Sequence, residues 1–121
     1  MSATQFDIEI EGGSTLLRGT PVTGVVRIDA TKPIKIRRVM LELRWETSGR
    51  GDRDRQKPLE MEIGQGPELP VGVSEFPFEF EAPLAPASYN GRLIKLFWEM
   101  RIRLDRPMAL DTKHTQRIEL L

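Results

Sequence analysis

The chain has 121 residues, of which 39% are hydrophobic and 30% are charged, a balance typical of a folded domain rather than a disordered one. Eighteen basic residues offset eighteen acidic ones, and this net charge of zero argues against nucleic-acid binding driven by phosphate contacts. The absence of cysteine excludes disulfides, thiolate metal sites and a cysteine nucleophile.

The length predicts a single domain over residues 1–121, large enough to fold without a metal or a disulfide. The N-terminal residues carry neither the basic nor the apolar region of a secretory signal. No apolar run approaches the roughly 20 residues that a membrane-spanning helix needs. We therefore expect a cytoplasmic protein without a membrane span.

Apolar residues alternate from close to the N-terminus, and this period of two predicts strands with one buried face. The first two predicted strands cover residues 6–10 and 21–29. Their apolar faces comprise Phe6, Ile8, Ile10, Val22, Val26 and Ile28.

The next predicted strand, residues 39–46, alternates without a break. Its inward residues are Val39, Leu41, Leu43 and Trp45, and its outward residues are Met40, Glu42, Arg44 and Glu46. Just upstream, Ile34 and Ile36 have the opposite phase. An extra residue shifts the pleat by one, so we expect a bulge near Arg37 and Arg38.

Two shorter strands follow, at residues 59–63 and 75–81. Their apolar residues are Leu59, Met61, Ile63, Phe76, Phe78 and Phe80. Pro77 lies between two of these phenylalanines and points outward. Because proline cannot donate to a sheet ladder, we expect this strand at a sheet edge or irregular there.

A long strand is predicted over residues 94–104, with Ile94, Leu96, Trp98, Met100, Ile102 and Leu104 on one face. The residues between them are charged except Phe97. A last strand closes the chain, with Ile118 and Leu120 as its inward pair. About seven strands without any helical periodicity predict an all-β fold, an immunoglobulin-like antiparallel β-sandwich with Trp45 and Trp98 in its core.

Three stretches, residues 18–28, 35–46 and 76–107, resemble the arrestin-like domain family. The last is the most specific, with its alternating phenylalanines, a proline-rich bend ending in Ser-Tyr-Asn-Gly, and a long strand closing on Asp-Arg-Pro. The nearest resemblance is to bacterial sporulation-control proteins. It implies an immunoglobulin-like sandwich that serves as a protein-interaction scaffold.

Two departures from the family matter. Its members commonly pair two sandwiches, whereas this length accommodates one, and a second could be supplied by another chain. Signalling arrestins read phosphorylated tails with basic residues on the first strand. Here that strand offers Asp7, Glu9 and Glu11, whose carboxylates would repel phosphate.

No catalytic constellation is recognised, and we expect no enzyme, no cofactor and no metal. His114 is the single histidine, without a second ligand at useful spacing, and is expected to be a solvated or edge residue. No serine lies in a Gly-x-Ser-x-Gly elbow. Arg50-Gly51-Asp52 matches an integrin-binding tripeptide, but a solvated hairpin loop is the favoured interpretation.

The charged face of the long strand has two interpretations. Its ionic residues could form cross-strand pairs with Glu42, Arg44 and Glu46. Phe97 and Met40 do not fit that interpretation, and either a loop covers them or they form a polar-rimmed contact patch. The candidate protein-contact residues are Phe97, Met40, Lys95, Glu99 and Arg101.

The favoured function is a non-catalytic adaptor or scaffold that binds a protein partner. The partner is either an unrelated protein or a second copy of the chain. The alternative is a structural subunit that self-associates through sheet edges or outer faces. An undetected hydrolase is the third hypothesis.

Overall fold

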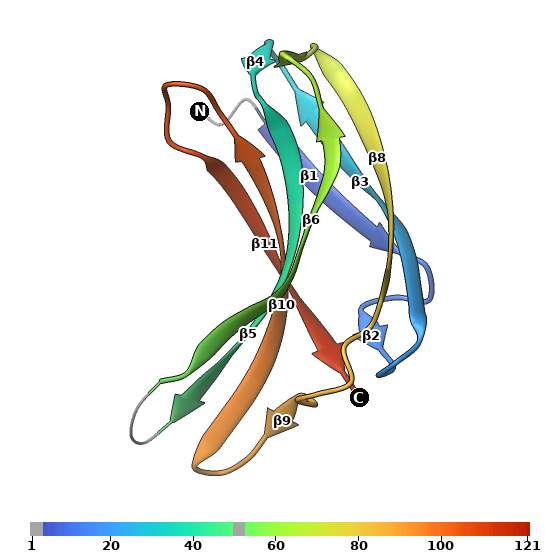
Figure 1. The fold of residues 1–121 in the computed structure, drawn as a ribbon, viewed down its shortest axis with the longest axis vertical. Coiled ribbons are helices and arrows are strands. Elements are labelled where there is room, and N and C mark those ends of the chain that lie inside the picture. The colour runs from blue at the N-terminus through green and yellow to red at the C-terminus, as the bar shows by residue number, and fades with distance from the viewer. Residues whose placement is uncertain (1–3, 50–52) are drawn as a thin grey trace.

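The structure is a computed structural model that describes residues 4–49 and 53–121, and the expected all-β fold is confirmed (Figure 1). Arg50-Gly51-Asp52 lies outside the described residues. Seven strands with seven or more residues occur in the described part: β1 (Thr4–Ile10), β3 (Pro21–Ala30), β5 (Arg38–Gly49), β6 (Arg55–Gln65), β8 (Gly72–Glu81), β10 (Ile94–Asp105) and β11 (Thr112–Leu120).

Four two-residue strands supplement the long ones: β2 (Thr15–Leu16), β4 (Ile34–Lys35), β7 (Glu68–Leu69) and β9 (Tyr89–Asn90). The strands form a three-stranded sheet in the order β1-β3-β8 and a six-stranded sheet in the order β2-β11-β10-β5-β6, with β9 also paired to β10. The pair β4-β7 stands apart. All pairs are antiparallel except the short contact of β2 with β11.

The core lies between the two large sheets, and β10 contributes its centre. Trp98, Met100, Ile102 and Leu104 are all 0% exposed. They belong to one hydrophobic cluster with inward residues of the opposite sheet, among them Val26 of β3. The alternation in the sequence therefore gave the correct inner face of β10, and the expected central position of Trp98 is confirmed.

Trp45 lies directly opposite Trp98 in the β5–β10 register, yet it is only half-buried. The reason is the shape of the sandwich. The ends of β5 and β10 near β9 diverge from the three-stranded sheet (Figure 1), and Ile94 at the start of β10 is 49% exposed. Trp45 thus borders the core, which corrects its expected central position.

One local expectation from the sequence is met, and a second is corrected. Strand β8 is the last strand of its sheet, where a proline is tolerated, and Pro77 faces Val25 of β3 across the ladder. The phase change before β5 occurs at Ile36 and Arg37, where the chain leaves β4 and begins β5. A break between two strands, rather than a bulge within one, lets Ile36 and Val39 both reach the core.

The proline-rich segment, residues 82–88, carries the chain from the three-stranded sheet to the six-stranded one. The indole Nε1–H of Trp98 donates to the carbonyl oxygen of Pro86 at 2.7 Å. The N–H of Ser88 donates to the carbonyl of Leu120 at 2.7 Å, and the N–H of Leu120 donates to the Ser88 hydroxyl at 2.9 Å. The crossing segment is therefore bound to both β10 and β11.

Replacing Trp98 with alanine is expected to lower the free energy of unfolding by ~3–5 kcal/mol, the range for large aromatic truncations in packed interiors. Lys95→Ala changes an exposed residue on the same strand and should cost less than ~1 kcal/mol. Urea denaturation of both variants measures the difference. Equal losses would contradict the assignment of the two faces of β10.

Candidate functional site on the outer face of the six-stranded sheet

Four of the five predicted contact residues lie on one face of β10. Lys95, Phe97, Glu99 and Arg101 alternate with the buried residues of this strand and therefore point away from the core. Lys95 is exposed, whereas the other three are half-buried. This arrangement agrees with the predicted orientation, and the contact role of these residues stays a prediction.

Phe97 is neither fully exposed nor covered by a loop. The guanidinium carbon of Arg117 lies 3.9 Å from the centroid of its ring. Arg117 comes from β11, where it is paired with Glu99, so it reaches Phe97 diagonally across the ladder. This cation–π contact covers part of the ring and is worth ~0.5–1 kcal/mol at an exposed site.

A groove of about 400 Å³ lies beside Phe97, where β9 and the end of β11 approach β10. Tyr89 and Leu121 line it and are 61% and 52% exposed. Lys95 and Arg117 also line this groove. Apolar side chains thus meet polar ones at an accessible concavity. We call Lys95, Phe97 and Glu99, together with this groove, the Phe97 surface.

Met40 does not belong to the Phe97 surface, which corrects the expected shared patch. Its side chain points outward as predicted, but it is only 4% exposed. The register places Met40 opposite Arg103 and Phe97 opposite Glu46, so the two apolar residues lie six positions apart, or about 20 Å. Met40 is flanked in mid-sheet by the long side chains of Arg103 and Glu62, which leave it little accessible surface.

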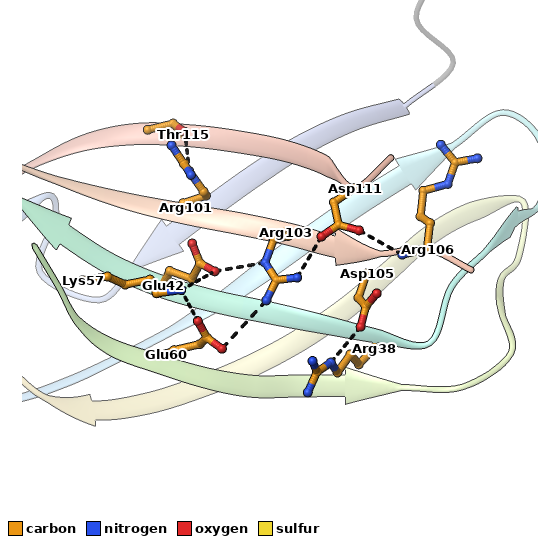
Figure 2. A network of polar contacts seen from close by, with 10 residues as sticks. All are labelled: Arg38, Glu42, Lys57, Glu60, Arg101, Arg103, Asp105, Arg106, Asp111 and Thr115. Atoms are coloured by element: carbon orange, nitrogen blue, oxygen red, sulfur yellow. Dashed lines mark hydrogen bonds and ion pairs between the residues drawn. The ribbon is translucent and has the colours of Figure 1, made fainter. Parts of the chain in front are cut away.

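Arg103 is the centre of an ionic network further along the same face (Figure 2). Its Nε donates to Glu42 of β5 at 3.0 Å, and its Nη1 donates to Asp111 at 2.9 Å. Its Nη2 lies 3.8 Å from Glu60 of β6. One guanidinium therefore connects β5, β6 and the turn between β10 and β11.

Glu42 is the buried member of this network, with 3% exposure. Its carboxylate is balanced by Arg103 and by Lys57, whose Nζ lies 3.6 Å away and also donates to Glu60. A buried carboxylate requires such partners because desolvation penalises its charge. The predicted cross-strand pairing is correct in kind. The partner is the diagonal Arg103 rather than Arg101, which lies directly opposite and donates to Thr115 Oγ1 at 3.4 Å.

The network also alters proton affinity. The hydrogen bond from Arg103 lowers the pKa of the Asp111 carboxyl below its ordinary value of 3.8. The hydrogen bond from Lys57 lowers the pKa of the Glu60 carboxyl below its ordinary value of 4.5. The same contacts raise the pKa of Arg103 and of Lys57. All four groups are therefore held in their charged forms near neutral pH.

A shallow depression of about 520 Å³ opens over this part of the sheet. Its charged lining consists of one carboxylate, Glu42, and six cations. The cations are Arg44, Arg55, Lys57, Arg101, Arg103 and Lys113. The chain has zero net charge, so this depression is a local concentration of positive charge.

His114 faces the margin between the two sheets. Its ring stacks on Phe6 of β1, with the centroids 5.2 Å apart. Strand β2 pairs β11 only at Glu119 and Leu120, so His114 lies on an open stretch of the strand, as an edge residue. Within residues 4–49 and 53–121 no group of three or more His, Asp or Glu side chains could hold a metal ion. No helix long and apolar enough to cross a membrane occurs there either.

The sequence interpretation included Arg103 among the residues that could pair with Glu42, but it missed the contacts of Arg103 with Asp111 and Glu60, and it missed the groove. Asp111 lies in a turn, where residues do not alternate, and Glu60 reaches Arg103 from β6 across the intervening strand β5. The contacts of Arg103 with these two residues therefore do not follow from the alternation of apolar residues. One signal was present. Glu42 stands between Leu41 and Leu43 in the most apolar stretch of a central strand, where a charge requires a partner.

No protein-family model and no curated protein matches the chain. Among solved structures, Spo0M, a sporulation control protein from Bacillus subtilis, superposes with a TM-score of 0.80 over 99% of this chain, at 20% sequence identity. The fold is arrestin-like. The resemblance expected from residues 18–28, 35–46 and 76–107 is thereby confirmed at the level of the fold.

The chain spans half the length of the Spo0M chain. The C-terminal domain of wzt gives a TM-score of 0.48 and 12% identity, over 100% of this chain and 75% of that one. At 20% identity the likeness to Spo0M shows the arrangement of strands, and it assigns no partner or activity.

Lowering the pH is expected to destabilise the protein below the ordinary values of 4.5 and 3.8 for Glu60 and Asp111. Both carboxyls bind protons less readily when folded, so the unfolded chain takes up more protons as the pH falls. Replacing Arg103 with methionine removes a partner of both groups. The variant should therefore lose less stability than the wild type between about pH 5 and pH 3.

The free energy of unfolding, measured by urea denaturation across this range, tests the prediction. Arg117→Met is the matched control because it removes a cation from the same face that contacts neither carboxylate. Identical pH profiles for the Arg103 variant and the wild type would contradict the role assigned to the network.

Proposed function

We propose that this domain is a non-catalytic protein-interaction module of the adaptor or scaffold type, and that it contacts its partner through the Phe97 surface. The groove beside Phe97 is the observation that supports this proposal. It combines exposed apolar side chains, Tyr89 and Leu121, with the charged rim of Lys95 and Arg117. A polar-rimmed apolar concavity is the usual anatomy of a protein contact.

The energetics of such a contact follow from its residues. Burying apolar surface of Tyr89 and Phe97 against a partner contributes ~25 cal/mol per Å² removed from water. Aromatic side chains also dominate the energy of many interfaces, because they bury a large area at little entropic cost. Lys95 and Glu99, which carry opposite charges, would set orientation more than affinity.

The chemistry of the outer face supports a non-catalytic role. A general acid or base needs a pKa near the working pH. The carboxyls of Glu60 and Asp111 have their pKa values lowered by Lys57 and Arg103, away from neutrality. These features argue against the hydrolase hypothesis.

Self-association as a structural subunit is the alternative, and the sheet edges bear on it. Strands β6 and β8 are the last strands of their sheets, so each has one open side. Each also contains a proline, Pro58 or Pro77, and several charged residues. Both features hinder the addition of another strand to β6 or β8, so these two edges favour an unrelated partner over a strand-paired assembly.

Placing a photoreactive phenylalanine analogue at position 97 is expected to yield a cross-linked protein in cells that naturally express the chain. The same analogue at Glu79, on the outer face of the three-stranded sheet, is the matched control. A product specific to position 97 identifies the partner. Calorimetry with that purified partner should then show binding at least tenfold weaker for Phe97→Ser, because each 1.4 kcal/mol lost is a factor of ten.

The Phe97→Ser variant should unfold within about 1 kcal/mol of the wild type, since only a cation–π contact and partial burial are lost. Equal cross-linking at positions 97 and 79, or unchanged affinity of the folded variant, would overturn the proposal. A cross-link only to a second copy, with a dimer in light scattering, would favour the structural subunit instead. The cytoplasmic location and the single-domain organisation stay predictions.

A further inference from the structure

Four of the cations in the depression form a row that crosses four neighbouring strands. Arg55 comes from β6, Arg44 from β5, Arg101 from β10 and Lys113 from β11. All four line the same concavity, so their charged ends share one patch of surface.

The register makes this row a regular diagonal. On each strand, the cation lies two residues away from the residue that is directly opposite the cation of the preceding strand. The residues that stand directly opposite Arg55, Arg44 and Arg101 on the following strand are Glu46, Glu99 and Thr115. Diagonal neighbours of this kind lie ~7–8 Å apart on one face of a sheet. The row therefore presents positive charge at nearly constant intervals.

Within the described residues, Arg44 is the one member of this row that has an ion pair. Arg103 and Lys57, the other two cations of the depression, are already paired with Glu42, Glu60 or Asp111. In the row, Arg44 lies 3.7 Å from Glu46. Arg101 donates to a neutral threonine, and neither Arg55 nor Lys113 has an ion-pair partner among residues 4–49 and 53–121.

Acidic residues lie on both outer faces of the sandwich. The outer face of the three-stranded sheet carries Asp7, Glu9 and Glu75, which surround its Arg27. Glu79 and Glu81 lie on the same face of β8. On the six-stranded sheet Glu46 and Glu99 stand directly opposite Arg55 and Arg44, but the depression itself is lined by six cations and a single carboxylate.

We propose that this row binds an extended acidic segment of a partner protein, in which every second residue is aspartate or glutamate. In an extended chain, alternate side chains point to the same side at intervals of ~6.6–6.8 Å. This interval nearly matches the spacing of the row, so successive carboxylates can each meet a cation. Charge-assisted hydrogen bonds from arginine to carboxylate are the contacts that form.

This inference rests on the proposed function only in taking the partner to be a protein, and it uses a different part of the sheet. The lining of the depression favours a peptide over a nucleic acid. None of the residues that line it is aromatic, so bases would find no ring to stack on.

Fluorescence anisotropy with two labelled heptapeptides of equal composition tests the spacing. In one peptide four glutamates alternate with three serines, and in the other the four glutamates are contiguous. The full chain at low ionic strength should bind the alternating peptide several-fold more tightly. Binding should weaken as salt is raised, because exposed charges are screened. Equal affinity for both peptides, or no binding of either, would overturn the proposal.

Variants then locate the site. Arg101→Ala and Lys113→Ala should each weaken binding of the alternating peptide by about two- to fivefold, as expected for exposed ion pairs. Lys32→Ala removes an exposed cation outside the depression and should change nothing. If Lys32→Ala weakened peptide binding as much as Arg101→Ala and Lys113→Ala do, binding would depend on the overall charge of the protein rather than on the row. That result would overturn the proposal.

Two further measurements separate this inference from the proposed function. Phe97→Ser should leave peptide binding unchanged, so each surface can fail alone. A single-stranded oligonucleotide that bound more tightly than the alternating peptide would overturn the assignment of a protein ligand. Self-association of the chain that disappeared in Lys113→Ala would do so as well, because the row would then serve a second copy.

Discussion

Complete burial of the inner side chains of β10 is the constraint on which the rest of the structure depends. Trp98 and Met100 have no exposed surface, and a slip of one residue would bring Phe97 and Glu99 into the core instead. Such a slip would bury a charge without a partner, which makes the register strongly specified. Because β10 is the central strand of its sheet, the same register decides which cations of β5, β6 and β11 become neighbours on the outer face.

The ionic network around Arg103 fixes which charged side chains on the outer face of the six-stranded sheet are paired. Ion pairs of low exposure contribute little net stability, because desolvation offsets most of the attraction between the charges. Their arrangement still has a clear consequence. Glu42 and Asp111 engage Arg103, while Arg101 and Lys113 keep their charge available in the same depression. A neutral chain can in this way line one depression with six cations and a single carboxylate.

Alternation in the sequence was sufficient to predict the seven long strands, the inner face of β10 and the edge position of the strand that contains Pro77. Alternation failed where the burial of a side chain depends on which neighbours cover it rather than on the face to which it points. Met40 points outward but is buried by its neighbours, and Trp45 points inward where the opposite sheet no longer covers it. The two-residue strands are too short to show alternation, so the sequence pattern does not predict them. The contact of Arg103 with Asp111 depends on the shape of a turn, which local pattern does not encode.

The unequal burial of the two tryptophans has a spectroscopic consequence. Trp98 is sealed in the core and hydrogen-bonded to Pro86, whereas its neighbour Trp45 lies where the sheets diverge. The indole of Trp45 therefore senses solvent near the splayed end of the sandwich, while that of Trp98 changes environment only when the two sheets separate. Intrinsic fluorescence thus provides two reporters on adjacent strands, one for local opening and one for the global transition, without an introduced label.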